Sequence, residues 1–153
     1  MKTWGVTTLI CLVTCMACTQ DKVFHHYNHT PVMGWERVDT LIYEVPAVPD
    51  SGYYSTDLGL RINGRFPFVS LTLIVEQTVY PAMIHHVDTI NCKLADRNGN
   101  FKGQGVSYYQ YRYPISRMKL HQSDSLHITV RHNMRREILP GISDVGIALT
   151  RLK

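Results

Sequence analysis

Beyond residue 18 the sequence contains a single cysteine, Cys92, and no apolar run long enough to cross a bilayer. A lone thiol cannot form an internal disulfide, so a domain built from this part of the chain depends on its hydrophobic core. Helix signals are also almost absent, because apolar residues alternate with polar ones in most segments. These absences exclude a disulfide-stapled scaffold, a polytopic membrane protein and a helical bundle.

Sequence frames typical of enzymes and metal sites are lacking as well. There is no Gly-x-Ser-x-Gly segment for a nucleophilic serine and no glycine-rich loop leading into a helix to hold phosphate. The acidic residues are scattered, without a conspicuous pair for glycoside hydrolysis. We therefore expect a protein that is not an enzyme, with no catalytic residues, metal ligands or cofactor.

The N-terminal segment has the pattern of an export signal that ends in a cysteine. Lys2 supplies positive charge, residues 4–16 are largely apolar and uncharged, and the small residue Ala17 precedes Cys18. The run is too short to span a bilayer. We interpret residues 1–17 as a lipoprotein signal peptide and Cys18 as the lipid-bearing first residue of the mature chain.

Two alternatives to this interpretation remain open. Cys15 is a second candidate for lipidation, because Thr14 is a tolerable residue before it. An ordinary secretory signal is the other alternative, although Thr14, Ala17 and Thr19 form a poor small-x-small cleavage site.

The rest of the chain has the size and pattern of one β domain. Cleavage before Cys18 would leave 136 residues, since 153 minus 17 is 136, which suits a single core. We expect a tether at 18–22 and a domain at 23–153. Strand-like segments occur at 23–29, 35–45, 54–62, 66–76, 87–95, 103–113, 126–131 and 142–152.

This spacing of strands predicts an all-β fold. Alternation gives each strand one polar face, which suits two sheets packed on a shared core. We predict a single antiparallel β-sandwich, jelly-roll or immunoglobulin-like, of about seven to nine strands. Asn63-Gly64 and the segment 96–100 each predict a hairpin turn.

The charge of the chain is uneven along its length. Residues 18–97 contain six Lys/Arg and nine Asp/Glu, a balance of −3, whereas residues 98–153 contain nine and three, a balance of +6. This skew indicates either a basic face for phosphate-rich lipid or an acidic partner, or cations spread over the surface. Nucleic acid is excluded as a partner because the chain is expected to be exported.

Histidines and the single thiol are the first candidates for reactive chemistry. His25 and His26 are adjacent, as are His85 and His86, and adjacent residues on a strand point to opposite faces. We therefore expect surface histidines rather than metal ligands. Cys92 sits in an alternating segment and is expected to be a small buried hydrophobe, with a catalytic thiol as the alternative.

Tyrosines gather near residue 110. Tyr109, Tyr111 and Tyr113 would share one face of a strand. Exposed, they would stack on sugar rings; turned inward, they would fill the core or its rim.

Short motifs follow one another along the chain after Cys18. They are Val23-Phe24 with Tyr27; Trp35, Asp39 and Leu41; Leu60-Arg61-Ile62-Asn63; Phe66-Pro67-Phe68; Asp88-Thr89-Ile90; Leu94-Ala95-Asp96; residues 99–105; Met134-Arg135; and residues 139–147. Together they resemble the GldH family of gliding-motility lipoproteins from Bacteroidota, over nearly the whole mature chain. The segment 141–146, Gly-Ile-Ser-Asp-Val-Gly, is the most specific part of the resemblance.

The resemblance implies a function. It implies a cell-envelope lipoprotein held in the outer or inner membrane by lipid on Cys18, facing the periplasm. Its role would be that of an accessory or scaffold component of gliding motility or associated secretion, through contacts with envelope proteins of that machinery. The spacing from Cys18 to Val23-Phe24 also favours Cys18 over Cys15. A module that binds envelope glycan is the alternative function.

Within the motifs the polar residues are expected to be mainly structural. We expect Gly141 and Gly146 to lie where a turn enters a strand, and the Asp144 carboxylate to accept hydrogen bonds from backbone amides at that entry. Arg61, opposite a carboxylate on a neighbouring strand, would form a buried pair, and Arg135 would do likewise. The alternative is that both are ordinary surface residues.

Overall fold

The computed structural model describes residues 21–153, in which every regular element is a β-strand. Cys18 and the signal segment therefore lie outside the described residues. Eight strands form two four-stranded antiparallel sheets. The first sheet has the order β1 (Lys22–His29), β10 (Ile142–Arg151), β4 (Gly52–Asn63) and β7 (Tyr108–Leu120). The second has the order β3 (Leu41–Val45), β8 (Ser125–His132), β5 (Ser70–Tyr80) and β6 (Ile84–Lys93).

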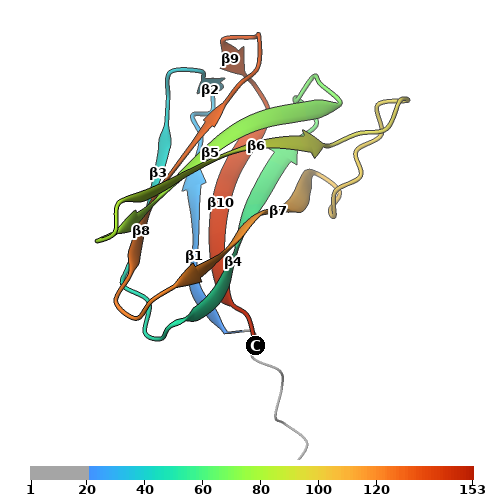
Figure 1. Cartoon of the computed structure of the whole chain (residues 1–153). Coiled ribbons are helices and arrows are strands. Elements are labelled where there is room, and N and C mark those ends of the chain that lie inside the picture. The colour runs from blue at the N-terminus through green and yellow to red at the C-terminus, as the bar shows by residue number, and fades with distance from the viewer. Residues whose placement is uncertain (1–20) are drawn as a thin grey trace, which may run out of the picture.

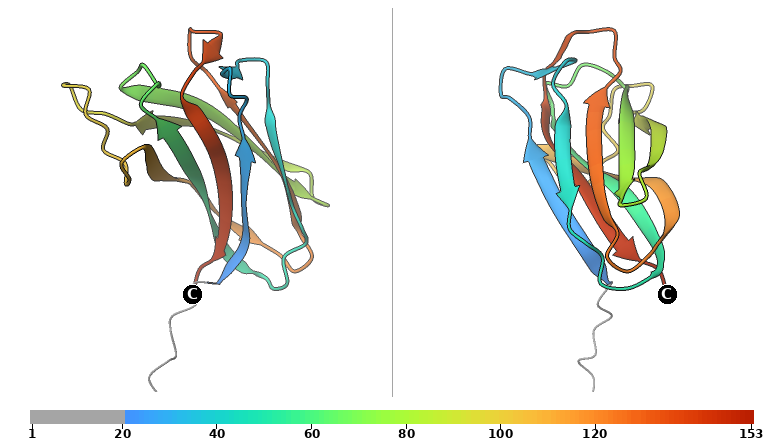
Figure 2. Two further views of the ribbon diagram at one scale, coloured as in Figure 1. Left: turned by 180° about the vertical axis from the view of Figure 1, so that it is seen from behind. Right: turned by 60° about the vertical axis from the view of Figure 1, so that its left-hand side comes forward.

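The two sheets pack face to face as the predicted sandwich (Figures 1 and 2). Between consecutive long strands the chain crosses from one sheet to the other, except at the β5–β6 hairpin. This order is the arrangement of a double-sheet jelly roll. It also shows that the hairpin expected at Asn63-Gly64 is wrong, because that turn leads from β4 into the opposite sheet.

Alternation along the strands builds the core between the sheets. In β4 the buried residues are Tyr54, Thr56, Leu58, Leu60 and Ile62, each separated from the next by a residue that faces outward. Strands β5, β8 and β10 contribute buried Leu, Ile and Val side chains in the same way. The period of two therefore places the remaining, alternate residues of each strand on the outer face of its sheet.

A short two-stranded element closes one end of the sandwich. The segment expected as one strand at 35–45 is divided into β2 (Trp35–Glu36) and β3, and β2 pairs with β9 (Ile138–Leu139). Trp35 is fully buried and its indole packs edge-on against buried His132, with 5.3 Å between ring centroids. The indole also donates to the Asp39 carbonyl at 2.9 Å, which turns the chain between the two strands.

The start of β1 and the end of β10 lie together at the other end of the sandwich (Figure 1). The Arg151 amide donates to the Asp21 carbonyl at 3.0 Å. β2 and β9 lie at the opposite end of the sandwich (Figure 1). A tether that precedes β1 would therefore be farthest from β2 and β9. Residues 21–153 include no helix with the length and apolarity to span a membrane.

Candidate functional site

The outer face of the first sheet carries the residues that recur in the sequence motifs. The strand register places Tyr27 of β1 beside Gly146 of β10, Gly146 beside Gly59 of β4, and Gly59 beside Arg112 of β7. Side chains of one cross-strand row lie on the same face and contact each other. The row therefore joins an aromatic ring, two glycines and a guanidinium across all four strands.

Tyr27 lies flat across the two glycines of this row. A Cβ at Gly59 or Gly146 would collide with the tyrosine ring or its hydroxyl. Both glycines interrupt alternating strands, and a glycine inside a strand marks a close approach of another group. The expectation that Gly146 lies at the entry of a strand is wrong, because it lies in the middle of β10. Arg61 covers the ring, with its Cζ 4.4 Å from the ring centroid.

The next row contains an ion pair between Arg61 and Asp144. Arg61 and Asp144 are register partners on β4 and β10, with Arg61 Nη1 4.0 Å from Asp144 Oδ2. Asp144 also contacts the imidazole of His29 and accepts the Ser143 hydroxyl at 2.7 Å. The expected pairing of Arg61 with a carboxylate is confirmed, with Asp144 buried and Arg61 partly exposed. The expectation for Asp144 is wrong, because its carboxylate contacts these side chains instead of backbone amides.

Gly141 does occupy a turn, as expected. Its φ is +84°, in the left-handed region that favours glycine, and it packs against the backbone of Phe66. The Asn63 amide donates to the Gly141 carbonyl at 2.8 Å. Two motifs distant in the sequence therefore meet where β4 ends and β10 begins. The expected Arg135 pair is wrong, because Arg135 is an exposed residue that contributes only its carbonyl, which accepts a hydrogen bond from the Arg37 guanidinium.

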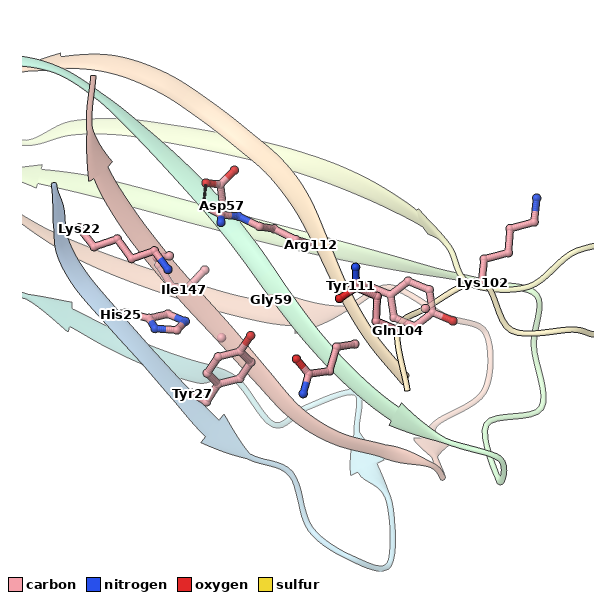
Figure 3. A pocket seen from close by; sticks show the side chains of 14 residues that line it. Lys22, His25, Tyr27, Asp57, Gly59, Lys102, Gln104, Tyr111, Arg112 and Ile147 are labelled. Carbon is pink, nitrogen blue, oxygen red and sulfur yellow. Dashed lines mark hydrogen bonds and ion pairs between the residues drawn. The ribbon is translucent and has the colours of Figure 1, made fainter. Parts of the chain in front are cut away.

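A groove of about 510 Å³ lies over the row of Tyr27 and the glycines (Figure 3). The small residues Gly59, Gly146 and Ala148 are among those that line it. We call it the sheet-face groove; its polar lining residues are Lys22, His25, Tyr27, Asp57, Lys102, Gln104, Gln110, Tyr111 and Arg112. Three separate motifs of the sequence contribute to the groove, through Tyr27, Gly146 and residues 102–104. The fold therefore brings together segments that are far apart in the sequence.

Positive charge prevails in the sheet-face groove. Arg112 Nη2 lies 2.5 Å from Asp57 Oδ2, so this acidic residue of the lining is already paired (Figure 3). Desolvation and the nearby cations Lys22, Arg112 and Arg61 lower the pKa of His25. The groove therefore has the electrostatic character of a site for an anionic group.

The tyrosine cluster is turned inward rather than outward. Tyr109, Tyr111 and Tyr113 are half-buried and pack against the core. The Tyr111 hydroxyl donates to the Leu94 carbonyl at 2.6 Å, and the Tyr113 hydroxyl donates to the Lys93 carbonyl at 2.9 Å. Desolvation raises the pKa of both phenols. These side chains fasten β7 to the end of β6, and they do not form an open platform for sugar rings.

Cys92 is fully buried on β6, as predicted, and burial raises the pKa of its thiol to about 12. A thiol with this pKa is protonated at neutral pH and is a poor nucleophile. His25 and His26 face opposite sides of β1, since His25 lines the groove and His26 lies edge-on to Tyr43. Within residues 21–153, no group of three His, Cys, Asp or Glu side chains is placed to hold a metal ion.

The cations of residues 98–153 are distributed over several surfaces. Lys102 and Arg112 line the sheet-face groove. Arg131 pairs with Glu76 on the second sheet, and Arg151 pairs with Asp50 near the C-terminal end. The excess of positive charge in residues 98–153 therefore does not gather on one face of the domain. The groove instead combines Lys22, from the acidic half of the chain, with two of these later cations.

The sequence reasoning missed the sheet-face groove as a site. Its lining comes from four strands and one loop, and each residue alone is ordinary on a strand. Gly59 and Gly146 were the available signal, because each stands between two buried aliphatic residues of an alternating strand.

Comparisons with known proteins cover nearly the whole domain. The chain matches the family described as GldH lipoprotein over residues 22–149, from the start of β1 into β10. It is similar to the Gliding motility lipoprotein GldH of Flavobacterium johnsoniae, with 26% identity over 148 residues that span 92% of each chain. Among solved structures, one match is the 4-O-methyl-alpha-glucuronidase BtGH115A of family GH115. The alignment covers 90% of this chain and 19% of the glucuronidase chain, with a TM-score of 0.47 and 11% identity.

Proposed function

This chain belongs to the GldH lipoprotein family, and we propose that it is a lipid-anchored component of a gliding-motility or associated secretion machinery, acting through protein contacts. The observation that carries the proposal is the family match over residues 22–149, together with a relative named for gliding motility that is matched over 92% of its length. The proposal assigns the protein a scaffold or accessory role and no catalytic activity.

The lipid on Cys18 gives the protein its location in this proposal. Each buried CH₂ contributes about 0.8 kcal/mol to membrane binding, so several acyl chains on one cysteine hold a domain at the membrane permanently. Encounter along a surface then raises the effective concentration of a weakly bound partner. The anchor places the domain in the cell envelope, and the sheet-face groove is the surface we assign to the partner.

The test is an affinity purification from the native envelope. The full-length protein with a C-terminal tag is crosslinked in living cells, purified, and its partners are identified by mass spectrometry. We expect envelope proteins of the motility or secretion machinery to be enriched over a control purification from cells that express the untagged protein. Recovery of no envelope protein above that control contradicts a role through protein contacts.

A further inference from the structure

The two ends of the sheet-face groove carry unpaired cations. Lys22 lies on β1 at one end, and Lys102 lies in the β6–β7 connection at the other (Figure 3). Among residues 21–153 neither lysine lies within ion-pair distance of a carboxylate, although Lys102 interacts with Asp96 electrostatically, and both lysines are exposed. Arg112 lies between them, with its charge offset by Asp57. The groove thus presents two available positive charges along one line.

The groove is long and shallow rather than a closed cavity for a small molecule. It crosses β1, β10, β4 and β7, whose three spacings of about 4.8 Å add to roughly 14 Å. An extended peptide advances by about 3.3 Å per residue, so four or five residues span this distance. The dimensions fit a short extended segment.

The aromatic rings of the groove pack against protein groups. One face of the Tyr27 ring is covered by Arg61, and the ring lies against Gly59 and Gly146. Tyr111 and Tyr113 stack on each other, with 6.1 Å between centroids and 8° between ring planes. The packing of Tyr27 and Tyr111 against these groups leaves little aromatic surface for stacking on a sugar ring. Charge and hydrogen bonds, from groups such as Gln104 and the Tyr27 hydroxyl, remain as the means of recognition.

We infer that the sheet-face groove binds an acidic, extended segment of a protein partner, with carboxylates of that segment facing Lys22 and Lys102. The inference rests on the proposed function, because it names the surface and the partner chemistry of the same protein contacts. Oppositely charged contacts of this kind govern the rate of association and the choice of partner more than they govern the stability of either protein.

The test compares two charge reversals in the full-length protein. Lys22→Glu/Lys102→Glu reverses the groove, whereas Lys93→Glu/Arg136→Glu makes the same change in charge at exposed residues outside the groove. We expect the groove variant to recover its partner about tenfold less than wild type, and the control variant to match wild type. Lys22→Gln/Lys102→Gln should have an intermediate effect. Thermal unfolding of each variant verifies that the fold is retained.

A photo-crosslinking amino acid at Gln104 identifies the occupant. We expect the crosslinked peptide to carry an excess of Asp and Glu over Lys and Arg. Equal partner recovery by the groove and control variants overturns the inference and leaves the proposed function standing. A neutral or basic peptide, a glycan or a lipid at Gln104 also overturns it. If wild type itself captures no protein, the proposed function fails first.

Discussion

Arg61 and Asp144 face each other across β4 and β10, with Nη1 and Oδ2 separated by 4.0 Å. The two side chains differ in environment, since 37% of the Arg61 side chain is exposed but only 6% of Asp144. The carboxylate therefore depends on its partners for solvation, whereas the guanidinium retains water. Arg61 also covers Tyr27, so the ion pair and the floor of the groove are one packed unit.

Replacement of Asp144 should destabilise the fold. We expect Asp144→Asn to lower the free energy of unfolding by about 1–3 kcal/mol, because contacts with Arg61, His29 and the Ser143 hydroxyl lose a charged acceptor. Urea denaturation measures the change. In a double-mutant cycle, Arg61→Gln/Asp144→Asn should cost less than the sum of the single changes. Strict additivity would show that the two residues do not interact.

A methyl group at Gly146 should disturb Tyr27. The added Cβ meets the ring, so we expect Gly146→Ala to lower the free energy of unfolding by about 1–3 kcal/mol. Gly64→Ala is the matched control, because a Cβ at that turn position meets nothing within 4 Å. In a Tyr27→Ala background the loss of stability caused by Gly146→Ala should fall to about 0.3 kcal/mol. An unchanged cost there would mean that the ring is not the obstacle.

The buried imidazole of His132 should make stability depend on pH. Its Nε2 donates to the Trp35 carbonyl at 3.1 Å, and its Nδ1 accepts the Met134 amide at 3.4 Å, so both nitrogens are engaged in the neutral form. Desolvation lowers the pKa of His132 below its ordinary value of 6.5. As the pH falls through 6.5, the unfolded chain takes up the proton first, and the free energy of unfolding decreases. Above that pH both states are neutral.

Urea denaturation at a series of pH values tests this dependence. Each pH is measured for wild type and for His132→Gln, and their difference isolates the contribution of His132 from that of the other histidines. We expect wild type to lose more stability than the variant on acidification. Parallel curves for the two proteins would contradict the assignment.

The sequence predicted most strands but not their partners. Alternation identified β1, β4, β8 and β10 nearly to their ends, because one buried face imposes a period of two on each strand. The choice between a jelly roll and an immunoglobulin-like sandwich depends on which sheet each strand joins, and local pattern carries no such information. The same limit hid the groove, whose residues become neighbours only through the pairings of β10 with β1 and β4.

The Cys92 thiol should be inert until the protein unfolds. It is fully buried with a pKa of about 12, so both access and thiolate formation are suppressed. We expect alkylation of Cys92 by iodoacetamide to be slow in native protein and fast in concentrated urea, as quantified by peptide mass spectrometry. Native alkylation as fast as that of an exposed peptide thiol would contradict the burial of β6.

The lipid anchor predicted at Cys18 separates location from folding. Arg151 and Asp21 join the two ends of the domain by a backbone hydrogen bond, and the strands of both sheets lie after residue 21. Cys18→Ala should therefore leave the free energy of unfolding unchanged while the protein leaves the membrane fraction. Cell fractionation with immunoblotting, together with intact-mass measurement of the mature N-terminus, tests both parts. A Cys18→Ala protein that is still processed and membrane-bound would show that Cys15 or an uncleaved signal holds it, and Cys15→Ala distinguishes those two outcomes.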